Sequence, residues 1–327
     1  MIESVPRRRI VTLLFAACVA RAPFGTAAAV PRRIVLIHEF EINDGHRRAH
    51  ARWLAQDGLI MGSDVVIEYV NLVAIRDVAE MERKARAIVA SRPDVILIDT
   101  DHTFLFKRLT SDIPIVFANF CCDLVRLGLV ESLQRPGGNV TGTASPPIDK
   151  ALEVAKELRP RMKRIGMLFD DNVPAQFLSE TREGNRPVAR RLGLVLVDIA
   201  IRRDAAFPDV ERAIRAARVD AVEIDLSERF SWEPDLMRFL ERARIIGLWG
   251  DAVAVRAGGL LAVHSDGGRG FRDAMGIAAR ILKGAKPAEM PVQINHYIHT
   301  SINLRTAKAM GIEIPPSVLT IADVVFR

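Results

Sequence analysis

The feature that most constrains the fold is a regular alternation of short apolar segments with longer amphipathic ones. The apolar segments predict strands, and the amphipathic segments between them, such as 45–58 and 77–94, predict helices. Two such series of similar length lie on either side of the glycine-rich stretch Leu133–Gly142. Strands that alternate with helices form βαβ units, whose right-handed crossovers place helices on both faces of a parallel sheet. The sequence therefore predicts an α/β protein with two Rossmann-like lobes, each built on a parallel sheet, joined by a hinge.

The glycine-rich stretch LQRPGGNVTG has neither the lysine nor the Ser/Thr of a phosphate-binding loop, and no helix pattern begins inside it. Its position between the two series predicts a crossover from the first lobe to the second, with hinge residues Gly137, Gly138 and Gly142. The predicted lobes are 30–142, completed by about 263–290, and 143–262, completed by about 291–327.

Residues 1–29 have the three parts of an export signal. A basic region is followed by the apolar run Ile10–Ala20, and a small-residue cleavage site ends at Ala29. The run is shorter than the roughly 20 residues that a membrane-spanning helix needs. The sequence thus predicts a periplasmic protein with a cleaved signal peptide; a lipid anchor at Cys18 and a twin-arginine signal are alternatives.

Composition argues against nucleic acid and metal as partners. Half of the net charge of +6 belongs to residues 1–29, and the remaining excess is small and spread along the chain. Cys121 and Cys122 are adjacent, so they predict neither a disulfide framework nor a zinc site. His46 and His50 have metal-ligand spacing, but the arginines around them favour a solvated basic helix face.

Catalytic motifs are missing from the sequence. It contains no G-x-x-x-x-G-K-[ST] phosphate loop and no G-x-S-x-G nucleophile elbow. We therefore expect a protein that is not an enzyme and that needs no cofactor.

Polar and aromatic residues that follow the predicted strands are the candidate ligand contacts, because ligands of open α/β sheets bind outside the carboxyl ends of the strands. Such residues also favour caps and turns, so each has a purely structural alternative. The candidates are Glu39, Phe40, Thr100, Asp101, Asn119, Phe120, Asp170, Asn172, Asp225, Asp251, His264 and Ser265.

Three segments carry a resemblance to a known family: SLQRPGGNVTG, RILKGAKPAEMPV and INLRTAKAMGIEIPPSVLTIADVV. The chain resembles the ABC-transporter substrate-binding proteins, in the branch with a type I periplasmic-binding fold that includes tryptophan- and tyrosine-type binding proteins. The resemblance extends from about Ile34 to Phe326. It implies a monomeric two-lobed protein that closes on a small organic solute and presents it to permease subunits in the membrane.

Two segments depart from the family pattern and leave the ligand open. HEFEIND, after the first strand, differs from the usual segment, and AVHSD stands where many members have a Tyr-Gly step. Three alternative functions also remain: a binding protein that serves a sensor kinase, a two-lobed transcription regulator, and a secreted α/β enzyme.

Overall fold

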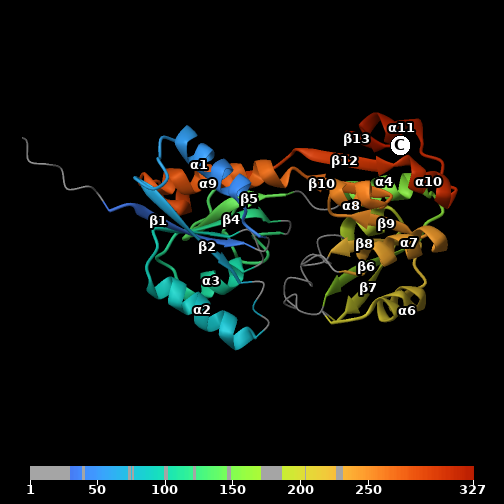
Figure 1. The fold of residues 1–327 in the computed structure, drawn as a ribbon, viewed down its shortest axis with the longest axis horizontal. Helices are drawn as coiled ribbons and strands as arrows, with labels where there is room; N and C mark the ends of the chain where they lie inside the picture. The colour runs from blue at the N-terminus through green and yellow to red at the C-terminus, as the bar shows by residue number, and fades with distance from the viewer. Residues whose placement is uncertain are drawn as a thin grey trace, which may run out of the picture. The chain divides into compact units, whose positions relative to one another are not determined.

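The computed structural model describes residues 30–38, 41–72, 75, 77–98, 102–120, 123–145, 149–170, 186–202, 204–225 and 231–327. Pro31–Arg327 form one compact unit that contains two β-sheets with helices packed against them (Figure 1). The predicted α/β class with two parallel-rich sheets is confirmed. Within the described part of the chain, no helix combines the length and the apolar character needed to cross a membrane.

The first sheet has the strand order β11-β5-β4-β3-β1-β2, and all of its neighbouring strands are parallel. Its strands are β1 (Arg32–His38), β2 (Val65–Asn71), β3 (Val95–Ile98), β4 (Ile115–Phe120), β5 (Val140–Ala144) and β11 (Gln293–Ile294). The associated helices are α1 (Asp44–Gln56), α2 (Val78–Ala90), α3 (Thr103–Leu109), α9 (Gly267–Leu282) and the short 3-10 helix η1 (Pro287–Glu289).

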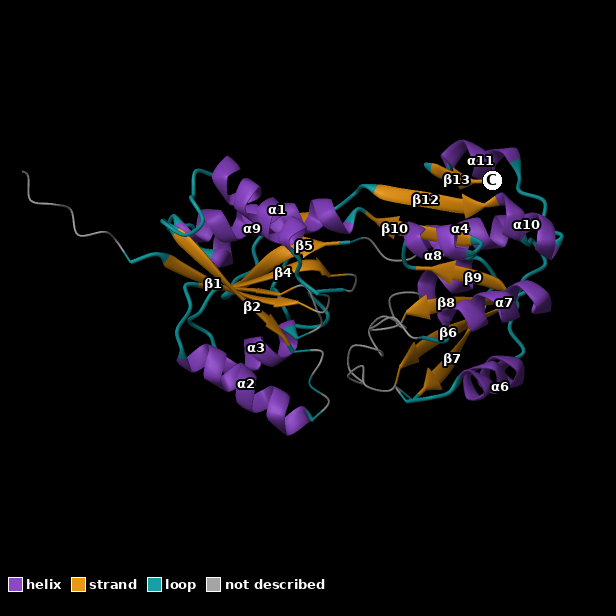
Figure 2. Ribbon diagram, viewed as in Figure 1, coloured by secondary structure: helices purple, strands orange, loops and turns teal. Residues whose placement is uncertain are grey.

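Helices cover both faces of the first sheet (Figure 2), as expected for a sheet whose strands β1 and β3 are buried on both faces. Ile34 and Leu36 pack with residues of α1 and α9, whereas Val35 and Ile37 pack with residues of α2 and α3. As predicted, α2 begins at a capping aspartate: the Asp77 side chain accepts a hydrogen bond from the backbone N–H of Ala79 at 2.8 Å.

The second sheet has the order β13-β12-β10-β9-β8-β6-β7. Its strands are β6 (Arg164–Asp170), β7 (Val195–Ile201), β8 (Ala221–Asp225), β9 (Ile246–Trp249), β10 (Leu261–Ser265), β12 (Ile298–Asn303) and β13 (Val324–Phe326). All neighbouring pairs are parallel except β10 and β12, which are antiparallel. The associated helices are α4 (Asp149–Leu158), α6 (Phe207–Ala217), α7 (Glu233–Ala243), α8 (Ala252–Ala257), α10 (Leu304–Met310) and α11 (Pro316–Ile321); residues 186–191 are also helical.

The predicted crossover from the first lobe to the second does not lie in the glycine-rich stretch, because the strands on either side of it belong to the same sheet. The glycine stretch connects β4 to β5, which are neighbours in the first sheet, and Gly142 lies inside β5. The chain therefore leaves the first sheet after Ala144, not within 133–142. It passes between the sheets again between β10 and α9, and between β11 and β12.

The prediction that His50 belongs to a solvated helix face is wrong. Its side chain is 3% exposed and its Nδ1 lies 3.0 Å from the Tyr69 hydroxyl. The imidazole also stacks on the Tyr69 ring and lies beside the rings of Trp53 and Phe271. This burial is not indicated by the polar and basic residues that surround His50 in the sequence. The burial is tolerated because an imidazole with a hydrogen-bond partner packs like an aromatic side chain.

Asn303 fixes the start of α10, and its replacement by alanine should destabilise the protein. The side chain is 2% exposed; its Oδ1 accepts hydrogen bonds from the backbone N–H groups of Arg305 and Thr306, and its Nδ2 donates to the carbonyl of Val255. Asn303→Ala leaves these buried groups without partners and should lower the free energy of unfolding by about 2 kcal/mol. Urea denaturation measures the change.

The exposed cap Asn43 of α1 offers a matched control. Its side chain also accepts from a backbone N–H, that of His46. Asn43→Ala should cost about 1 kcal/mol or less, because water replaces the lost bond. Equal losses for the two variants would contradict the role assigned to burial at Asn303.

Candidate functional site

The carboxyl ends of the parallel strands hold most of the predicted ligand contacts. Among these, Glu39, Phe40, Thr100, Asp101 and Asn172 lie outside the described residues. Asp170 and Asp225 are the last residues of β6 and β8, which are parallel neighbours with Phe169 opposite Asp225. The backbone therefore brings these two positions to the same edge of the second sheet, as the sequence predicts.

Asn119 lies at an irregularity near the end of β4 and is held by α9. It has a φ of 56°, in the left-handed region, where the register between β4 and β5 shifts. Its Nδ2 donates to the carbonyl of Gly267 at 3.0 Å, and its backbone N–H donates to the Thr143 hydroxyl at 3.1 Å. The Thr143 hydroxyl donates in turn to the carbonyl of Gly270 at 3.0 Å. These contacts attach the end of β4 to the first turn of α9.

Phe120 and Asp251 have local structural contacts. The Phe120 side chain is 4% exposed and meets the rings of Phe104 and Phe117 edge-on in the core of the first sheet. Asp251 caps α8, where its Oδ1 accepts from the backbone N–H of Ala254 at 2.8 Å. Phe120 thus packs in the core and Asp251 caps a helix, and each contact agrees with the purely structural alternative expected from the sequence for these candidates.

His264 and Ser265 end β10, where the chain passes towards α9. The hydroxyls of Ser265 and Ser145 are 2.7 Å apart, and Ser145 directly follows β5. This bond therefore joins two of the segments by which the chain passes between the sheets. His264 Nδ1 lies 3.0 Å from the carbonyl of Ser265.

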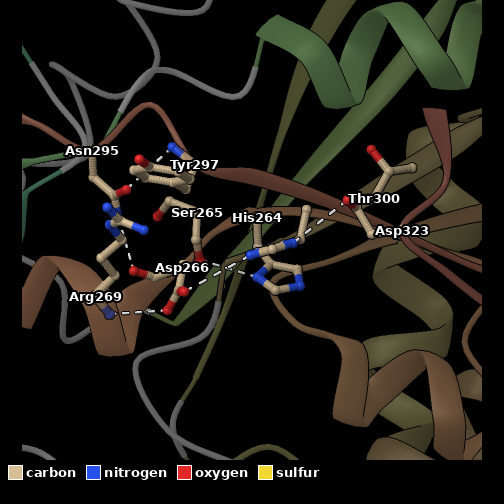
Figure 3. A network of polar contacts seen from close by, with 9 residues as sticks. His264, Ser265, Asp266, Arg269, Asn295, Tyr297, Thr300 and Asp323 are labelled. Atoms are coloured by element: carbon tan, nitrogen blue, oxygen red, sulfur yellow. Dashed lines mark hydrogen bonds and ion pairs between the residues drawn. The ribbon is translucent and has the colours of Figure 1, made fainter.

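Sequence reasoning missed the polar network that surrounds Ser265 (Figure 3). At its centre, the backbone N–H of Asp266 donates to the carbonyl of Tyr297 at 2.9 Å, and the Asp266 carbonyl accepts from Asn295 Nδ2 at 2.7 Å. The Asp266 carboxylate accepts from the backbone N–H of Arg269 at 2.9 Å, which caps α9. The Arg269 guanidinium lies 3.5 Å from the centre of the Tyr297 ring. The network thus ties the β10–α9 passage to the β11–β12 passage.

Two histidines of the first lobe, His50 and His102, have pKa values depressed by burial. Burial, together with the nearby His46, Arg47 and His38, lowers the pKa of His50 from 6.5 to about 4. His38, the last residue of β1, is 6% exposed and its ring contacts Tyr69 edge-on.

His102 follows the candidates Thr100 and Asp101 in the sequence and directly precedes α3. Burial lowers the pKa of His102 from 6.5 to about 4, and its Nε2 lies 3.1 Å from the sulfur of Met81. Among the described residues, no group of three or more His, Cys, Asp or Glu side chains is placed to hold a metal ion.

Known proteins resemble both the sequence and the fold. The chain is 34% identical over 129 residues to the tyrosine-binding protein of Clostridioides difficile (strain R20291), which is 39% of this chain and 36% of that relative's length. A conserved domain protein from Vibrio cholerae is 25% identical, with a TM-score of 0.76 over 90% of this chain and 100% of that one. An ABC domain in complex with L-Trp from Streptococcus pneumoniae shares the fold at 24% identity, with a TM-score of 0.74 over 91% of this chain and 100% of that one.

A family model spans most of the chain. Residues 52–326 match the model of the ABC transporter substrate binding proteins. The match contains all three of the segments on which the resemblance rests, and also the Ser265–Asp266 network. The chain therefore belongs to the ABC transporter substrate binding protein family.

Proposed function

We propose that this protein is the extracytoplasmic solute-binding component of an ABC importer. It binds a small organic solute between its two lobes, which close around the solute by bending at the passages between the sheets. The family match over residues 52–326 carries this proposal. The network at Asp266 supports the mechanism, because a hinge needs a few defined residues where the chain passes between two rigid bodies.

Amino acids are the solutes that we propose to test first. The tyrosine-binding relative and the fold neighbour in complex with L-Trp support this class. A ligand amine would meet carboxylates at the strand ends, for which Glu39, Asp101 and Asp225 are the candidates. A ligand carboxylate would be bound by backbone N–H groups at helix N-termini beside the same ends.

A thermal-shift screen of amino acids, aromatic acids and other small metabolites tests the proposal. A solute that binds only the folded protein stabilises it by about 2.7 kcal/mol at a concentration 100 times its dissociation constant. We therefore expect L-tyrosine, L-tryptophan or a related amino acid to raise the midpoint of unfolding in proportion to the logarithm of its concentration.

The predicted carboxylates are tested on the solute that the screen identifies. Asp101→Ala and Asp225→Ala should each weaken its binding at least about tenfold in equilibrium dialysis, because a charged hydrogen bond to the ligand is lost. Asp251→Ala is the matched control, since Asp251 caps α8, and its affinity should stay near that of the wild type. Unchanged affinity in both test variants would reject these carboxylates as ligand contacts.

A further inference from the structure

Two histidines face each other where the chain passes between the sheets. His264 of β10 and His299 of β12 are directly opposite in the antiparallel pair, and their ring centres are 5.8 Å apart. β12 is the first strand of the second sheet after the β11–β12 passage, and β10 is the last before the β10–α9 passage. The pair therefore lies on the two strands of the second sheet that adjoin these passages.

His299 lies between two carboxylates. Its Nε2 is 3.9 Å from Asp266 Oδ2, and its Nδ1 is 3.8 Å from Asp323 Oδ1. These distances are those of ion pairs rather than hydrogen bonds, so a neutral imidazole pairs with neither carboxylate, whereas a protonated imidazole pairs with both. Both ion pairs therefore depend on protonation of the ring.

The two carboxylates belong to different parts of the fold. Asp266 caps α9, which packs on the first sheet. Asp323 is bound to the second sheet: its Oδ2 accepts from the backbone N–H of Thr300 at 2.7 Å, and its own N–H donates to the carbonyl of Thr300. A protonated His299 thus connects the cap of a first-sheet helix to a second-sheet strand through two ion pairs.

The other charged groups of this cluster favour His299 as the residue that takes the proton. His264 Nδ1 lies against the carbonyl of Ser265, and its Nε2 is buried with no hydrogen-bond partner among the described residues. Protonation of His264 would bury an N–H without an acceptor and place a second positive charge beside His299. The Arg269 guanidinium, the nearby positive charge, lies over the Tyr297 ring.

We propose that His299 is a proton-dependent link between the β10–α9 passage and the second sheet, and that its protonation regulates the opening and closing of the lobes. The inference rests on the proposed function, because closure around a solute is what the link would regulate. The contacts are partly exposed, with side-chain exposures of 39%, 42% and 44% for His299, Asp266 and Asp323. We expect them to change the ratio of two lobe arrangements roughly threefold, since each exposed ion pair contributes modestly.

Double electron–electron resonance on the solute-free protein tests the link. Spin labels are placed at the exposed positions Arg48 of α1 and Arg212 of α6, in a background in which serine replaces the native cysteines. In the wild type, the population ratio should change roughly threefold between about pH 8 and about pH 6. Because no solute is used, this result is independent of the amino-acid screen.

Variants of His299 separate the proposal from other effects of pH. His299→Gln should show the wild-type distribution of high pH at both values, and His299→Lys the distribution of low pH at both. The exposed neighbour His296 provides the control, and His296→Gln should keep the wild-type response. If substitution of His299 impairs folding, Asp323→Asn should still reduce the response. A wild type that does not respond to pH, or a His299→Gln variant that responds fully, would overturn the proposal.

Discussion

Acidification from about pH 7 to about pH 4 should lower the free energy of unfolding by several kcal/mol, chiefly because two histidines are held neutral in the first lobe. Burial lowers the pKa values of His50 and His102 from 6.5 to about 4. The unfolded chain therefore binds protons more readily than the folded protein. The stability that these groups contribute is complete above about pH 6.5 and is lost as the pH falls towards 4.

The size of the effect follows from the shift. Each pKa unit corresponds to 1.36 kcal/mol, so His50 and His102 should each account for about 3 kcal/mol. Urea denaturation at a series of pH values measures this loss. His50→Phe keeps a packed ring and removes the titration; we expect it to be less stable by about 1 kcal/mol at neutral pH, where the bond to Tyr69 is missing, and to lose less stability in acid.

A control variant and one contradicting result decide whether the burial of His50 causes the acid sensitivity. The control His296→Gln removes an exposed histidine and should leave the pH profile unchanged. If His50→Phe lost as much stability in acid as the wild type, the burial of His50 would not be the cause of the acid sensitivity.

Local pattern was enough to predict the α/β class and most of the helices and strands. Strands such as β3 are apolar throughout, and α2 has an aspartate at its cap, so neighbouring residues alone indicate both. The same reasoning misjudged His50, because the rings of Tyr69 and Phe271 that bury it come from β2 and α9. Burial by residues distant in sequence leaves no local periodicity.

The polar network around Ser265 and Asp266 could not be predicted either, because it also joins residues that are distant in sequence. His264 and Ser265 were predicted as ligand contacts because they follow a strand, but their partners are distant in sequence. His299 lies opposite His264 through strand pairing, and Ser145 follows β5 of the other sheet. An antiparallel strand within an otherwise parallel sheet cannot be derived from alternating strands and helices. Asp266, three residues before Arg269, did carry a local helix-cap signal.

Gly142→Ala should destabilise the protein by at least about 3 kcal/mol, because the added methyl group has no space between two strands. A Cβ atom at Gly142 would lie 2.1 Å from the carbonyl oxygen of Phe117 and 2.7 Å from its ring. Phe117 is directly opposite Gly142 in the parallel pair of β4 and β5, and its side chain is fully buried. A backbone oxygen cannot move away unless the two strands separate.

Gly138 supplies the matched control within the same glycine stretch. A Cβ atom at Gly138 would meet no atom within 4 Å, so Gly138→Ala should change the free energy of unfolding by no more than about 0.5 kcal/mol. Urea denaturation of both variants separates two explanations for these glycines. A loss confined to Gly142→Ala means that Gly142 is required for close strand packing in the first sheet. Similar losses in both variants would mean that the backbone freedom of the whole stretch matters, and would contradict the packing explanation.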